Sequence, residues 1–82
     1  MATSNSVQDL LLENTKNWRL KIDDTTSTTI TYFGKADPGT LTSEAKWQIY
    51  ILDETSGLDK KYANGSDSYL NVWDNRVSIT YT

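Results

Sequence analysis

The stretch that decides the fold runs from Thr28 to Ile51 and reads TTITYFGKADPGTLTSEAKWQIYI. Apolar and polar side chains alternate near both of its ends, which is the pattern of two β-strands joined by an irregular loop. Apolar groups lie on both faces of this pair, so the second face requires a cover from this chain or from another protein. The faces are Thr28, Ile30 and Tyr32 against Thr29, Thr31 and Phe33 in the first strand, and Trp47, Ile49 and Ile51 against Gln48, Tyr50 and Leu52 in the second.

The chain is short, with 82 residues, and contains neither cysteine nor histidine. A domain of this size buries only about 60% of the surface that its unfolded chain exposes, so its stability is marginal. The composition excludes disulfides, thiolate metal sites and imidazole ligands. Oligomerisation or docking onto a larger assembly is the remaining common source of stability for so small a core.

The charges argue against two classes of partner. Lysine and arginine number 8 against 11 acidic residues, which gives a net charge of -3 without a long run of either sign. Nucleic-acid binding relies on clustered cations, and the sequence has no such cluster. The first residues, MATSNSVQDLLLENTK, lack a basic flank, and their apolar run of three leucines is too short for a signal peptide or a membrane span. We expect a protein made in the cytoplasm that binds neither nucleic acid nor membrane.

The pattern separates residues 1–16 from a single β-domain over residues 17–82. A helix would bring two of the three adjacent leucines of this first segment onto one face, whereas a strand over residues 7–12 fits almost as well. In either case these leucines need a second surface. If residues 1–16 are a capping segment, that surface is the core of the domain; if they are an arm, it is a neighbouring subunit. The three leucines are Leu10, Leu11 and Leu12.

Residues 17–23 form a clean strand pattern, with Trp18, Leu20 and Ile22 on one face. The DDTTST turn that follows has the chemistry of a tight turn and leaves no room for a crossover helix. We therefore expect an antiparallel hairpin between this strand and the next one.

The second half of the chain continues the same architecture. A hairpin turn at residues 55–57 leads to a return strand over residues 58–63. A short helix is expected to begin near Ser66 or Asp67, and residues 77–81 alternate as a final strand. The whole pattern predicts an all-β fold, either a small antiparallel β-sandwich or a partly open β-barrel with at most one short helix.

The sequence does not indicate catalytic or metal-binding residues. General acid–base catalysis would depend on the acidic pairs Asp23-Asp24 and Asp53-Glu54, which lie at strand ends beside turns, where carboxylates are usually solvated. Residues 64–68, NGSDS, offer oxygen ligands for calcium, but an Asn-Gly turn followed by a cap explains them better. We predict a protein that is not an enzyme and that holds no cofactor and no metal.

Aromatic residues make up 11% of the chain, including three tryptophans and five tyrosines. Small β-domains use bulky rings to fill a thin core, and this accounts best for Trp18 and Trp47. Aromatic and apolar side chains on a second sheet face are typical of a protein interface. The interface candidates are Leu10, Leu11, Leu12, Phe33, Tyr50, Leu52, Tyr69 and Trp73.

Three motifs stand out in the last two thirds of the chain. They are YFGKADPGT at residues 32–40, WQI at residues 47–49 and NVWDNRVSITY at residues 71–81. In this order they resemble the Y-x-G-x-A-x-P-G-T, W-x-I and N-V-W-D-N-R-x-S-x-T-Y elements of a group of short, largely uncharacterised virion structural proteins of tailed bacteriophages. The resemblance does not extend to the N-terminal third.

The resemblance implies a non-enzymatic building block of the phage particle, made in the host cytoplasm and present as a homo-oligomer or in many copies. A capsid decoration, or cement, protein that stabilises the shell is the first expectation. A head-to-tail or tail-associated component is the alternative, so the partners would be the major capsid protein or neck and tail proteins. A small carbohydrate-binding module for host recognition is an alternative from another class, since aromatic side chains could serve it too.

Within these motifs, five residues are expected to support the structure rather than to bind a partner. Pro38 and Gly39 suit the two central positions of a type II turn. The guanidinium of Arg76 is expected to bond a carboxylate, that of Asp74 or another, or the carbonyls of the loop at residues 37–39. The structural-loop candidates are Asp37, Pro38, Gly39, Asp74 and Arg76.

Overall fold

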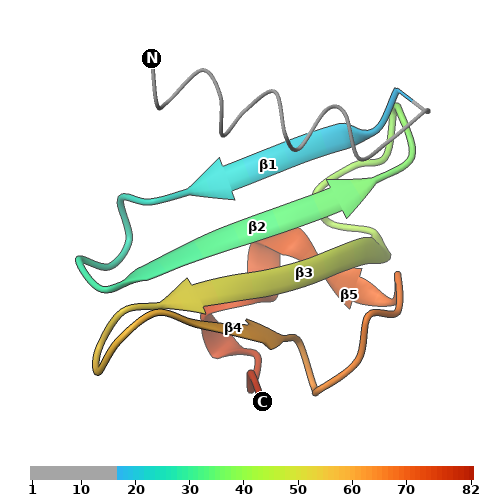
Figure 1. Cartoon of the computed structure of the whole chain (residues 1–82). Coiled ribbons are helices and arrows are strands. Elements are labelled where there is room, and N and C mark those ends of the chain that lie inside the picture. Colours follow the sequence, from blue (N-terminus) through green and yellow to red (C-terminus); the bar gives the residue numbers. More distant parts are fainter. Residues whose placement is uncertain (1–16) are drawn as a thin grey trace.

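The computed structural model describes residues 17–82, and the interpretation of residues 1–16 as an arm or a capping segment lies outside them. Five strands and one short 3-10 helix make up this part of the chain (Figure 1). The predicted fold class, a small antiparallel all-β fold with one short helix, is therefore confirmed. The elements are β1 (Arg19–Asp23), β2 (Ile30–Ala36), β3 (Ala45–Asp53), β4 (Asp59–Tyr62), β5 (Asn71–Val72) and the helix η1 (Trp73–Ser78).

The four longer strands form one antiparallel sheet in the order β1-β2-β3-β4. Both expected hairpins are present, because β1 pairs with β2 and β3 pairs with β4. The strand β5 pairs with the beginning of β3, with a register shift between Ala45 and Trp47. The side chain of Asn71 reinforces this pairing, since its Nδ2 donates to the carbonyl of Trp47 at 3.1 Å.

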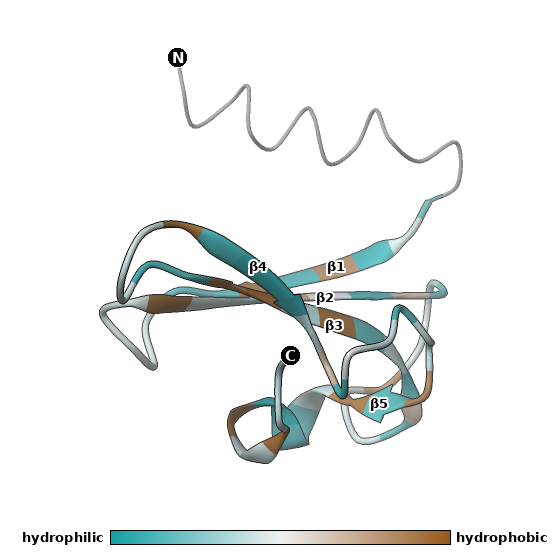
Figure 2. Ribbon diagram, turned by 60° about the horizontal axis from the view of Figure 1, so that its bottom comes forward, coloured by the Kyte–Doolittle hydropathy of each residue, from teal (hydrophilic) through white to brown (hydrophobic). Residues whose placement is uncertain are grey.

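The C-terminal segment covers one face of the sheet. Figure 2 shows β5, η1 and the C-terminus together on one side of the four strands. The end of the chain closes this layer, since Ala63 and Tyr81 form an isolated antiparallel bridge. Ile30, Ile79 and Tyr81 pack around the core at its margin. The buried core consists of Tyr32, Ala36, Trp47, Ile49, Ile51, Ala63 and Trp73.

The two turns that the sequence predicted most specifically are formed. In the first, the Thr40 amide donates to the carbonyl of Asp37 at 3.2 Å, and Gly39 has a φ of 82°, as the third residue of a type II turn requires. In the second, Asn64 and Gly65 both have positive φ, and the bond that closes the turn runs from the amide of Ser66 to the carbonyl of Ala63 at 3.1 Å. The NGSDS sequence is thus a turn, as its composition favoured.

The last segment differs from the prediction. The short helix was expected near Ser66 or Asp67 and a final strand over residues 77–81; instead, residues 73–78 form η1, and of the final strand only the bridge at Tyr81 remains. The reason is tertiary packing. The Trp73 ring, 3% exposed, must pack over the sheet, and a tight turn directly after β5 places it there.

The strand β1 has its apolar side turned away from the core. Its register places Arg19, Lys21 and Asp23 opposite core-facing positions of β2, so Leu20 and Ile22 lie on the other face. Arg19 and Asp23 on this side have partners from distant parts of the chain. The Arg19 guanidinium donates to the carbonyl of Thr40, and its centre lies 5.7 Å from the centroid of the Trp47 ring.

Candidate functional site: the open face of the sheet

The side of the sheet opposite η1 carries no other element of the described chain (Figure 2). We call this side the open face. The pairing of the strands places three rows of side chains across it, because residues directly opposite each other in paired strands share a face. The rows are Leu20, Lys35 and Gln48; then Ile22, Phe33, Tyr50 and Tyr62; then Thr31, Leu52 and Lys60.

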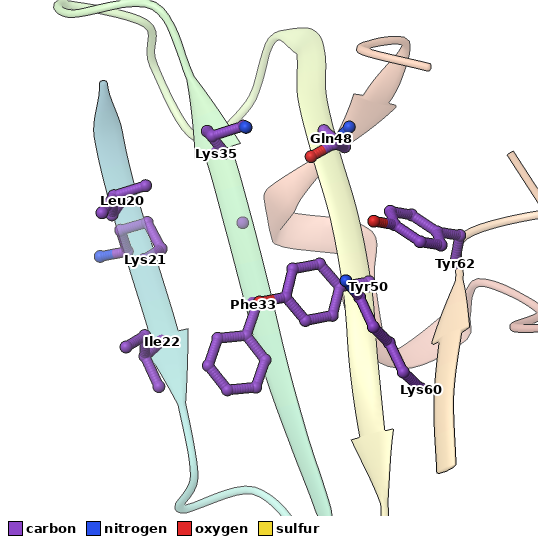
Figure 3. A pocket seen from close by; sticks show the side chains of 10 residues that line it. Leu20, Lys21, Ile22, Phe33, Lys35, Gln48, Tyr50, Lys60 and Tyr62 are labelled. Carbon is purple, nitrogen blue, oxygen red and sulfur yellow. The ribbon is translucent and has the colours of Figure 1, made fainter. Parts of the chain in front are cut away.

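The middle row forms a continuous apolar and aromatic strip across all four strands. The rings of Phe33 and Tyr50 are stacked, with centroids 4.8 Å apart, and the Tyr62 ring lies 5.5 Å from that of Tyr50. At the outer end of the row Ile22 is 50% exposed. A hollow lies over this strip (Figure 3), lined also by Leu20, Lys21, Gly34, Lys35, Gln48 and Lys60. The open face therefore offers rigid rings and aliphatic groups at the surface of the described domain.

Each of the two lysines in these three rows lies against a pair of rings. The ammonium group of Lys60 lies 4.5 Å from the ring centroid of Tyr50 and 5.1 Å from that of Tyr62. At the other end of the face, the ammonium group of Lys35 lies 4.9 Å from the Trp18 ring and 5.9 Å from the Tyr69 ring. Such contacts hold the charges at defined positions above the aromatic surface.

The interface candidates from the sequence divide into four groups. Phe33, Tyr50 and Leu52 lie on the open face, whereas Tyr69 is half-buried and stacks on Trp18 with ring centroids 5.5 Å apart. Trp73 requires a correction, because it is 3% exposed in the core and is not available to a partner. The leucines at positions 10 to 12 lie outside the described residues: Leu10, Leu11 and Leu12.

Sequence reasoning did not assign Leu20, Ile22, Lys35, Lys60 or Tyr62 to this site. The signal was present in the alternation of each strand, but the side of β1 and β4 that faces the core depends on the register with β2 and β3. The lysines of β4 suited a solvated sheet edge equally well. Only the register shows that Lys60 shares a face with Leu52 and that Lys61 does not.

On the covered side of the sheet, an ion pair ties η1 to the end of β1. Arg76 Nε and Nη2 each lie 2.9 Å from Asp23 Oδ2, and the Arg76 guanidinium also lies 4.7 Å from the centroid of the Trp73 ring. Arg76 is thus a structural residue, as expected, and its carboxylate partner is Asp23. Asp74 is exposed, and its amide donates to the carbonyl of Thr42 at 3.1 Å.

The carboxylate of Asp23 is 8% exposed and accepts hydrogen bonds at both oxygens. Thr26 donates to it through its hydroxyl and its amide, and Thr25 does the same. These bonds hold the pKa of Asp23 well below its usual range despite burial. The bond from the Thr26 hydroxyl has the largest effect, and the Arg76 guanidinium lowers the pKa further. Asp23 therefore has a structural role: it joins the turn at Thr25 and Thr26 to Arg76.

The hydroxyl of Tyr81 completes this support of η1. It donates to the carbonyl of Arg76 at 2.7 Å, next to the core cluster around Tyr32. Burial raises the pKa of Tyr81 well above its usual value of about 10. The phenol thus remains protonated throughout the physiological pH range and can donate its hydrogen bond to the carbonyl of Arg76 in η1.

Asp23→Asn is expected to destabilise the domain by about 3 kcal/mol at neutral pH, because it leaves the part-buried Arg76 guanidinium without its counter-charge. Since the folded pKa of Asp23 is depressed, its contribution is present above the unfolded pKa of about 3.9 and is lost as pH falls below that value. Urea titrations at pH 7 and at several acidic pH values should measure the free energy of unfolding of both proteins. The difference between wild type and variant should decrease below about pH 4.

The matched control is Asp24→Asn, which changes the same chemical group one position along, at an exposed side chain. Its free energy of unfolding should stay within about 0.5 kcal/mol of that of wild type at neutral pH. If Asp23→Asn behaved like this control, the ion pair to Arg76 would contribute nothing to stability.

The other candidate carboxylates are engaged in turn structure. Asp53 Oδ1 accepts from the amide of Thr55 at 2.9 Å, and its Oδ2 lies 3.4 Å from Lys61 Nζ. The side chain of Thr55 above all, then its amide and Lys61, lower the pKa of Asp53. Glu54 is exposed and its amide donates to the carbonyl of Thr29 at 2.8 Å. Across residues 17–82, no three acidic, histidine or cysteine side chains gather as a metal site would need.

Within the same range, no helix has the length and apolar character to cross a membrane. Comparison of the chain with protein-family models, with curated proteins and with solved structures gave no match. The fold and the open face define the chain as a small antiparallel β-domain with one face packed by its own C-terminal segment and the other apolar, aromatic and basic.

Proposed function

We propose that this chain is a non-enzymatic structural component of a tailed-phage particle, attached to other virion proteins through the open face of its sheet. The observation that carries the proposal is the pair of unlike faces: the chain covers one with β5 and η1, while the middle row of the other consists of Ile22, Phe33, Tyr50 and Tyr62. Aromatic side chains fixed in such a row are typical anchors of protein interfaces.

The resemblance of the motifs at residues 32–40 and 71–81 to virion proteins supports the particle as the place of action. Much of what these motifs contain has a structural role in the domain: the type II turn, Gly34 beneath two tryptophans, and Arg76 on Asp23. The motif residues therefore stabilise the fold of the domain, whereas the open face supplies the surface for contact with a partner. Capsid decoration suits a small domain that binds in many copies, since each copy stabilises the shell by mass action.

The test uses particles of the encoding phage grown without this chain. Purified chain added to them is expected to sediment with the particles and to raise the temperature at which the shells release DNA. The double variant Phe33→Ala with Tyr50→Ala should remain folded yet bind at least tenfold more weakly, because two neighbouring anchors are lost. A matched control is Val77→Ala, which truncates an exposed side chain of η1 and should bind like wild type.

Binding of the purified chain to tails alone would assign it to the tail and contradict the decoration role. Binding to cell-surface glycans, without any binding to particles, would replace the structural role by host recognition.

A further inference from the structure

The middle row of the open face is apolar and aromatic, yet no helix or strand among residues 17–82 covers it. Figure 2 places β5, η1 and the C-terminus on the opposite side of the sheet. The Phe33–Tyr50 stack and the half-exposed Ile22 would gain free energy from an element that excludes water from them. Residues 1–16 are the part of this chain that precedes the described range, so they are the first candidate for that element.

Residues 1–16 contain apolar side chains of the kind that such a cover requires. Val7, Leu10 and Leu11 stand at positions i, i+3 and i+4, which share one face of a helix, and a strand over residues 7–12 would also present leucines on one side. The core side of the sheet has no room for them, because β5 and η1 already cover it. The open face is therefore the apolar surface of this domain that is left for these side chains.

The connection to the sheet begins where this segment needs it. The described range starts at residue 17, two positions before β1, which stands at one end of the strand order. The ring of Trp18 lies on the open side, since it is 4.9 Å from the ammonium group of Lys35 in the first row. The distance across the four strands is about 14 Å. Residues 13–16 alone can span about 13 Å, so residues 7–12 can reach the middle row.

We propose that residues 7–12 pack on the open face of their own chain, with Leu10 and Leu11 against the rings of the middle row. The connection is short, so the segment meets its own face at an effective concentration in the millimolar range. A second copy in dilute solution lacks this advantage and must also lose its freedom of translation and rotation. This packing belongs to the chain by itself and goes beyond the proposed attachment to particles. A virion partner that uses the same face competes with residues 7–12 for it.

NMR spectra of the full chain with isotope-labelled leucine methyl groups test the contact directly. Nuclear Overhauser contacts are expected from the methyl groups of Leu10 or Leu11 to the rings of Phe33 and Tyr50. No such contact is expected to the ring of Trp73, which is buried on the covered side. In a mixture of labelled and unlabelled chains, the contacts should arise within single molecules and not between them.

The variant Leu10→Ser with Leu11→Ser should lose these contacts and unfold at a lower urea concentration than wild type, because serine gains little from burial against the rings. The matched control is Leu58→Ser with Leu70→Ser, which makes the same change at two leucines that are 72% and 75% exposed. The midpoint of the control should stay close to that of wild type.

A third variant shows whether the loss comes from the open face itself. Phe33→Ala should lower the urea midpoint by less in the background of Leu10→Ser with Leu11→Ser than in wild type, because the ring has already lost its partner there. An equal effect of Phe33→Ala in the two backgrounds would contradict the packing.

Three further results would overturn the proposal. They are methyl contacts to neither ring, equal midpoints of the two double leucine variants, and contacts that arise only between labelled and unlabelled molecules. The last result would assign the face to a second copy. A wild-type chain that shows the methyl contacts within one molecule and yet does not bind particles would instead reject the proposed function alone.

Discussion

Trp47→Ala is expected to remove most of the stability of the domain. The indole is fully buried, its ring centroid lies 5.9 Å from that of Trp73, and its Nε1–H donates to the carbonyl of Leu41 at 3.0 Å. Truncating a buried tryptophan costs about 3–5 kcal/mol, compared with roughly 4–12 kcal/mol of total stability for a domain of this length. Urea unfolding followed by circular dichroism should show a midpoint at much lower urea and a partly unfolded baseline.

The control for this variant is Trp18→Ala. Trp18 is half-buried, and its ring stacks on that of Tyr69 at the margin of the sheet. Its removal should cost about 1 kcal/mol, because the position is already partly hydrated and one aromatic contact is lost. If the two variants unfolded at the same urea concentration, the Trp47 ring would not be the centre of the core.

The sequence was sufficient for the elements that depend on local pattern. Alternation located β1 to β4 and gave the correct split of side chains between the faces of β2 and β3. Pro38 and Gly39 specified their turn because only one turn type uses a proline followed by a residue with positive φ. These features follow from a few adjacent residues, which is why they were predictable.

The features that depend on distant contacts were not predictable in the same way. The side of β1 that faces the core carries residues with distant partners: Asp23 pairs with Arg76 from 53 positions along the chain, and Arg19 donates to the carbonyl of Thr40. A pattern limited to residues 17–23 favours burial of Leu20 and Ile22 instead. The open face as a set was missed for the same reason, since it exists only once four strands are in register.

The C-terminal segment shows how packing overrides alternation. Val77, Ile79 and Tyr81 alternate like a strand, but η1 ends at Ser78, and Val77 is 59% exposed. What fixes this segment is the fit of Trp73 over the sheet, for which the sequence did contain a signal. A glycine in the interior of a strand, as at Gly34, often marks a place where another group approaches the backbone closely.

Gly34→Ala is therefore expected to destabilise the domain by about 3 kcal/mol through a steric contact alone. A Cβ at this position would lie 2.5 Å from Cε3 and 2.7 Å from Cζ3 of Trp73, and 3.1 Å from Cε3 of Trp47. Both rings are buried, so neither can move aside without disturbing the core. Urea unfolding of the variant should show the same dependence on denaturant as wild type, with a lower midpoint.

Two further variants separate the contact from other effects of adding a methyl group. Gly57→Ala places its Cβ in open space at a φ of 102°, so its cost, about 1 kcal/mol, comes from the backbone alone. Adding Trp73→Leu to Gly34→Ala removes the ring that the new Cβ meets. The double variant should then be at least about 1 kcal/mol more stable than the sum of the two single changes predicts, because the clash is absent from it. Additive effects would show that the Trp73 ring is not the reason why position 34 requires glycine. In that case the packing of Trp73 on the sheet would no longer explain why η1 forms in place of the expected strand over residues 77–81.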